Sequence, residues 1–136
     1  MTIPIHLEHR PIVAVDRYNE IDGPFAPNSD AQALSLGWAQ YDAADFSAKV
    51  FRQVNGQWSR QSEELPMHRV LDLGILILGS MTQRPAPVTN LRDELMDSNS
   101  IGQLRNYFQS QQVTEILRPR LEELRRLLSL RELVNY

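Results

Sequence analysis

The chain has 136 residues, 42% hydrophobic and 23% charged, which is enough for a soluble globular fold with one core. Its formal net charge of −3 argues against a protein that binds duplex nucleic acid. The sequence contains no cysteine, which excludes disulfides, thiolate nucleophiles and Cys-ligated metal sites. We expect no signal peptide, and the longest apolar run is shorter than the roughly 20 residues that cross a bilayer. These features predict a cytoplasmic protein with no membrane partner.

The first thirty residues predict an extended segment followed by a long loop. Residues 3–15 look extended, and Pro4 and Pro11 favour an edge or an irregular strand. Residues 16–30 contain Asp22-Gly23-Pro24 and Pro27-Asn28, which are typical of a loop. A loop of that length in a small domain often has a function.

A β-meander is predicted from residue 33 to residue 62. Residues 33–41 and 46–54 have strand character, and Asn55-Gly56 favours a two-residue hairpin turn into a third strand, 57–62. This turn sets Val54 opposite Gln57 and Phe51 opposite Arg60. If Tyr41 pairs with Phe46 across the first hairpin, one sheet face carries these residues: Leu34, Leu36, Trp38, Lys49, Phe51, Trp58 and Arg60.

Three helices are expected in the second half of the chain. Pro66 suits the first turn of a helix over 66–82, which is apolar almost all round and should be central and buried. Residues 83–100 should be mostly loop, with a short helix at 91–96. A second helix is expected at 101–117, a break or kink at Arg118-Pro119 and a third helix from Pro119 to Val134. The predicted fold is a single α+β domain (1–136) with a helical part from about residue 100: an antiparallel meander packed against about three helices.

The junction between the third strand and the first helix is the strongest candidate site. Cations, aromatic rings and free N–H groups at a helix start would suit a planar or phosphorylated anion. Glu64, His68 and Asp72 have i, i+4, i+8 spacing and share one side of a helix, so His68 is the catalytic candidate, with Glu64 and Asp72 to orient it. The predicted ligand-binding residues are Lys49, Trp58, Arg60, Glu63, Glu64, His68 and Arg69.

The alternative for the same residues is a closed structural network. Glu63 and Glu64 are favoured at a helix start by the dipole alone, and Arg60 and Arg69 would pair with nearby carboxylates. Such a cluster would join the strand to the helix without binding anything.

Other patterns give weaker signals. His6-x-x-His9 has a metal-like spacing, but the flanking prolines disfavour a helix, and residues three apart in a strand point to opposite faces. The sequence has no phosphate-loop or nucleophile-elbow motif, and we expect no metal and no cofactor. Residues 113–136 hold five arginines and four glutamates, which is typical of a solvated helix rather than a nucleic-acid surface. The leucines at 117, 121, 124 and 128 suit a core or a homodimer through the C-terminal helix.

Three segments carry a resemblance to a known family. They are Ala33-Leu34-Ser35-Leu36-Gly37-Trp38-Ala39-Gln40, then Lys49-Val50-Phe51-Arg52, and the run from Trp58 to Pro66. With Pro119-Arg120-Leu121, they resemble a family of small bacterial proteins carried only as a domain of unknown function. The resemblance implies no substrate, activity or site residue.

Two functions follow from the sequence. The leading hypothesis is a non-catalytic binding protein that uses the 58–72 cluster for a small anionic ligand or a protein partner. The alternative is a small enzyme that acts on a nucleotide-like or phosphorylated metabolite, with His68 as acid or base and Arg60 and Arg69 holding the anion.

Overall fold

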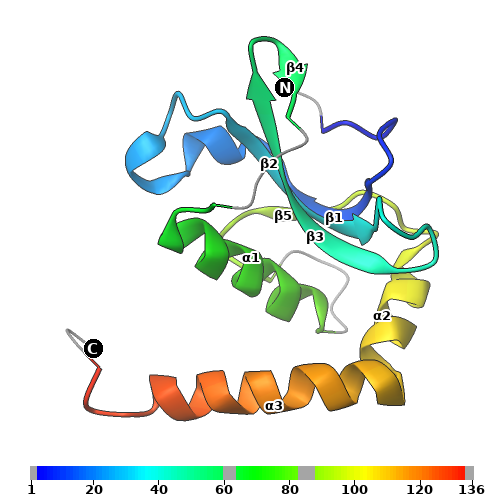
Figure 1. Cartoon of the computed structure of the whole chain (residues 1–136), viewed down its shortest axis with the longest axis vertical. Coiled ribbons are helices and arrows are strands. Elements are labelled where there is room, and N and C mark those ends of the chain that lie inside the picture. Colours follow the sequence, from blue (N-terminus) through cyan, green and yellow to red (C-terminus); the bar gives the residue numbers. More distant parts are fainter. Residues whose placement is uncertain (1–2, 60–63, 83–87, 134–136) are drawn as a thin grey trace. The chain divides into compact units, whose positions relative to one another are not determined.

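The computed structural model describes residues 3–59, 64–82 and 88–133 (Figure 1). The chain divides into two compact units, Met1–Gly102 and Gln103–Tyr136, which are treated separately. The expected single domain therefore stays a prediction. Among the described helices, none combines the length and apolar character that crossing a membrane requires.

The first unit contains a five-stranded antiparallel sheet in the order β4-β3-β2-β1-β5, and the predicted α+β fold is confirmed. The strands are β1 (Arg10–Val15), β2 (Ala31–Trp38), β3 (Phe46–Val54), β4 (Gln57–Trp58) and β5 (Asp93–Leu95). Asn55 and Gly56 have φ of 53° and 78°, as the predicted two-residue turn requires, and Val54 pairs with Gln57. The predicted pairing of Phe51 with Arg60 falls outside the described residues. The short helix expected at 91–96 is wrong, because β5 pairs there with β1.

The first hairpin has a different register from the predicted one. Phe46 pairs with Trp38 rather than Tyr41, and residues 39–45 form the connection. Side chains of the connection favour this register, because Asp42 accepts from Ala44 N (2.9 Å) and Asp45 accepts from Phe46 N (2.8 Å). The observed register differs from the predicted one by an odd number of residues, which exchanges the two faces of β2 relative to β3. Phe51 therefore shares a face with Ala33 and not with Leu34.

The N-terminal segment covers the face that carries Phe51. His9 lies at its centre, with Nε2 2.8 Å from Ser35 Oγ, Nδ1 3.2 Å from Ser47 Oγ, and its ring edge-on to Phe51. Ile3 packs with Ala14, Ala33 and Phe51 in one buried cluster. The small side chains of β2 thus face residues 3–9.

Helix α1 (Met67–Ser80) lies along the opposite face and follows Pro66, its N-cap residue (Figure 1). The C-terminal end of α1 is joined to the sheet through Thr89. Gly79 lies against Thr89, and the hydroxyl of Thr89 donates to Asp93 Oδ1. Asp93 belongs to β5 and pairs with Val15 on β1, which in turn pairs with Leu34 on β2. The expectation of a buried helix is wrong. Only Arg69, Leu76 and Ser80 are buried, while Met67 is 86% and Leu71 66% exposed. One stripe of the helix contacts the sheet, although its sequence is apolar nearly all round.

The second unit is helical. Helix α2 (Ile101–Gln109) runs into it and α3 (Gln111–Leu128) forms most of it. Of the break or kink predicted at Arg118-Pro119, the break is wrong, because α3 continues through Pro119. The chain breaks instead at Ser110, whose hydroxyl caps α3 by accepting from Val113 N (3.3 Å). Pro119 is exposed inside α3, where water can satisfy the carbonyl that loses its N–H partner.

Gly37 should tolerate no side chain. A Cβ there would lie 2.1 Å from the Arg10 carbonyl oxygen on β1, so Gly37→Ala must separate the two strands. We expect a loss of about 3 kcal/mol in the free energy of unfolding, measured by urea denaturation. Gly102→Ala, where a Cβ meets nothing within 4 Å, is the matched control and should cost nothing. Equal effects of the two changes would contradict the close approach of β1 and β2.

His9 predicts a pH dependence of stability. Burial, and to a smaller extent the charge of Lys49, lowers the pKa of His9 from 6.5 to about 4. Between these two pH values the unfolded chain binds a proton at His9 that the folded chain does not, so stability falls as pH decreases through this window. The expected loss is on the order of 2–3 kcal/mol. His9→Asn should flatten this part of the curve in pH-dependent denaturation, and an unchanged slope would contradict the assignment.

Candidate functional site

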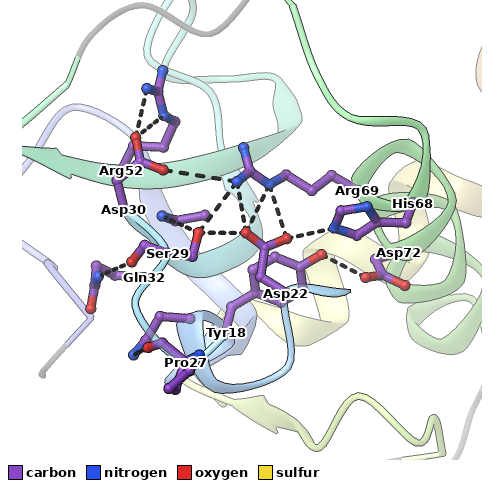
Figure 2. A network of polar contacts seen from close by, with 12 residues as sticks. Tyr18, Asp22, Pro27, Ser29, Asp30, Gln32, Arg52, His68, Arg69 and Asp72 are labelled. Atoms are coloured by element: carbon purple, nitrogen blue, oxygen red, sulfur yellow. Dashed lines mark hydrogen bonds and ion pairs between the residues drawn. The ribbon is translucent and has the colours of Figure 1, made fainter. Parts of the chain in front are cut away.

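Asp22 is the centre of the polar network that joins α1 to the sheet (Figure 2). It lies in the predicted 16–30 loop, which contains the short 3-10 helices η1 (Tyr18–Glu20) and η2 (Gly23–Phe25). Its side chain has no exposed surface. Oδ2 accepts from Arg69 Nη2 (2.7 Å) and from the hydroxyl of Ser29, while Oδ1 accepts from His68 Nε2 (2.7 Å). Both carboxylate oxygens are therefore fully engaged by donors.

Arg69 reaches Asp22 from the first turn of α1. Its Nε lies 3.1 Å from Asp22 Oδ1, so the guanidinium binds the carboxylate through two nitrogens. The centre of the Phe25 ring lies 5.5 Å from Arg69 Cζ, which adds a cation–π contact to the pair. Burial alone would raise the pKa of Asp22, but hydrogen bonds from Arg69, Ser29 and His68, with the charge of Arg69, lower it below its usual value. The hydrogen bond to Asp22 correspondingly raises the pKa of Arg69. Both groups are charged and pair with each other.

His68 occupies the outer side of the same carboxylate. Because Asp22 is ionised and only accepts, His68 Nε2 carries the proton of their hydrogen bond. A Cβ at Gly23 would lie 3.1 Å from His68 Nε2, so only glycine lets the loop lie this close to the ring, and its φ of 49° also favours glycine. The side chain of His68 is 31% exposed.

Two further contacts extend the network to β3 and to the second turn of α1. The hydroxyl of Tyr18, which is fully buried, donates to Asp72 Oδ2 (2.6 Å), and burial, this hydrogen bond and the neighbouring carboxylates raise the pKa of Tyr18. At the other end, Arg52 binds Asp30 through Nε (2.9 Å) and Nη2 (2.6 Å). Asp30 Oδ1 in turn lies 3.8 Å from Arg69 Nη2. The network thus fixes α1 to the loop and the loop to β3.

The geometry favours a structural role for Arg69. Its charge is neutralised by Asp22, and releasing it to hold an anion would leave a buried carboxylate unpaired. His68 with Asp22 has the arrangement of an oriented acid–base pair, but the same carboxylate also binds Arg69.

The structure brings together two of the seven predicted ligand-binding residues, His68 and Arg69. Lys49 and Trp58 lie on the sheet face opposite α1, where Lys49 Nζ bonds Gln40 Oε1 (2.6 Å) and Trp58 packs edge-on against Phe51. Glu64 is exposed, and Arg60 and Glu63 fall outside the described residues. The orienting roles expected of Glu64 and Asp72 fall instead to Asp22, since Asp72 accepts from Tyr18. Ligand binding by the seven stays a prediction.

Asp22, Ser29 and Tyr18 were missed by sequence reasoning. Asp22-Gly23-Pro24 looks like an ordinary turn, and the sequence separation of 46 or 47 positions between Asp22 and its partners on α1 hides the pairing. One signal was present: an arginine at the start of an apolar helix needs a carboxylate if it is buried.

Removing one member of the central pair should be far more damaging than removing both. Asp22→Ala leaves Arg69 buried with only the longer contact to Asp30, and we expect it to lose about 3–5 kcal/mol of unfolding free energy. The double change Asp22→Ala with Arg69→Met should recover a large part of that loss. Glu123→Ala, which removes an exposed pair with Arg126, is the control and should change nothing measurable in urea denaturation. Additive losses in the double variant would contradict the proposed coupling.

The comparisons with known proteins agree with the resemblance seen in the sequence. Residues 1–91 match a family of unknown function (DUF6530), and this range contains every residue of the network in Figure 2. Neither the search of curated proteins nor the search of solved structures gave a match. Within the described residues, no three His, Asp or Glu side chains gather as a metal site requires. The chain therefore belongs to this family of unknown function.

Proposed function

We propose that the chain is a non-catalytic protein-binding domain whose docking surface is the outward face of α1. The observation that carries this proposal is the exposure of large apolar side chains along one helix. Met67 is 86% exposed, and the same face continues through further residues: Val70, Leu71, Ile75 and Leu78. A contiguous apolar surface of this kind on a folded protein is typical of an interaction site.

The polar residues of α1 support the same proposal. Arg69 and Asp72 both turn toward the loop and are bound by Asp22 and Tyr18. The outward face is therefore free of their charges, and the network holds the helix by its other side. A protein partner fits this surface better than a small anion, because the buried Arg69 already has its anion in Asp22.

The enzyme alternative depends on His68 alone. Its 31% exposure and its hydrogen bond to Asp22 would allow proton transfer to a bound molecule. The enzyme hypothesis expects Arg60 and Arg69 to hold the anion. Arg69 is bound by Asp22, and Arg60 lies outside the described residues. Binding is accordingly the function that the geometry supports better.

The proposal is tested by site-specific photo-crosslinking in cells. A photo-reactive phenylalanine analogue in place of Leu71 should give a discrete cross-linked species, because this position lies in the docking surface. The same analogue in place of Glu94, which is exposed on β5, is the control and should give none. The species from position 71 should disappear when Leu78→Asp places a charge on the surface. No species from position 71, or the same species from both positions, would contradict the proposal.

A further inference from the structure

We infer that the partner of this surface is a second copy of the chain, with the two α1 helices packed antiparallel across a twofold axis at Gly74. The inference rests on the proposed function, since it names the occupant of the same helix face. It is carried by the symmetry of that face, by the open space over Gly74 and by a hollow beside the C-terminal end of α1.

The apolar residues on this side of α1 form a palindrome about Gly74, in which Met67, Val70, Leu71 and Leu78 are exposed and Ile77 and Met81 are half-buried. At three positions from Gly74, the two residues are Leu71 and Ile77. At four positions they are Val70 and Leu78, and at seven positions they are Met67 and Met81. Steps of three, four and seven stay on one side of a helix. In an antiparallel pair centred on Gly74, each apolar residue therefore meets one of similar size from the other copy, as an isologous interface requires.

Gly74 suits the crossing point of such a pair. It lies in the middle of α1, and a Cβ added there would meet nothing within 4 Å. Within the described residues, one chain thus gives no packing reason for glycine, which in a helix costs up to about 1 kcal/mol relative to alanine. A second backbone approaching closely supplies that reason.

Charge also favours the antiparallel pair. The seven palindromic residues, Met67, Val70, Leu71, Gly74, Ile77, Leu78 and Met81, carry no charge, so two copies of the face do not repel each other. The antiparallel arrangement sets the positive N-terminal end of one helix beside the negative C-terminal end of the other.

A hollow next to the C-terminal end of the face can receive the most exposed residue of the other copy. It has a volume of about 550 Å³, and its apolar lining includes Ile75, Leu78, Val88 and Leu91. In the antiparallel pair, Met67 of the second copy lies beside Met81, close to this hollow, and a flexible Met side chain fills irregular space well. The seven residues are far fewer than the roughly 20–30 that each partner contributes to a standard interface, so we expect a weak dimer with Kd on the order of 10 µM.

Cysteine pairing tests the symmetry directly, because the chain has no cysteine of its own. Under mild oxidation, Gly74→Cys should give a disulfide-linked dimer. Val70→Cys alone should not, since two copies of position 70 are about 12 Å apart along the helix axis and a disulfide needs Cα atoms within about 7 Å. A mixture of Val70→Cys and Leu78→Cys should again cross-link. Pairing of Val70→Cys with itself, or no pairing of Gly74→Cys, would overturn the inference.

Sedimentation of the purified full chain gives the second measurement. The unmodified chain should associate with rising concentration. Gly74→Gln, whose Cβ meets nothing within 4 Å in the described residues, should remain monomeric, with a melting temperature no lower than that of the unmodified chain because Gln favours the helix more than Gly does. Leu124→Asp, on the exposed leucine stripe of α3, is the control and should still dimerise. Loss of the dimer in Leu124→Asp but not in Gly74→Gln would assign the interface to α3 and overturn the inference. A monomer at every concentration, with a cross-link from position 71 to a different protein in cells, would refute self-association and leave the proposed function standing. A monomer with no such cross-link would refute both.

Discussion

The buried ion pair between Asp22 and Arg69 is the constraint on which the rest of the first unit depends. It joins a loop that would otherwise be held by two short 3-10 turns to the first turn of α1, and Asp30 with Arg52 carries the connection on to β3. Two opposite charges removed from water are stable only together and with their remaining hydrogen-bonding groups satisfied. Ser29, His68 and the ring of Phe25 complete that environment. The pair thus sets which side of α1 faces the protein.

The orientation of α1 explains why large apolar side chains are exposed on its outer side. A helix that is apolar nearly all round could turn either side inward, and the network selects the side with Arg69, Asp72 and Leu76. The consequence is that Met67, Leu71 and Leu78 point outward. A fold that fixes its polar groups inward and leaves an uncharged apolar stripe outside supports the binding function that we propose. The symmetry of that stripe about Gly74 suits a second copy as the partner.

Local signals in the sequence predicted most of the fold. The Asn55-Gly56 turn, the helix entered at Pro66 and the α+β class depend on residues close together in the chain, and the structure confirms them. The errors arose where competing contacts decide the outcome. Hydrogen bonds of Asp42 and Asp45 favour a longer connection between β2 and β3, which changes which residues share a sheet face. The cap at Ser110 places the helix break there rather than at Pro119. For the site, His68 and Arg69 were identified because of their local setting, whereas Asp22 was not, because its partners are distant in sequence.

Hydrogen exchange measured residue by residue tests the central role of the ion pair most directly. In Arg69→Met the carboxylate of Asp22 stays buried without its cation, so the amides of α1 and of residues 18–30 should lose protection together. The paired amides of β2 and β3 should keep theirs, because their ladder does not depend on the loop. A uniform loss across sheet and helix, or unchanged protection in α1, would show that the ion pair does not hold the helix in place.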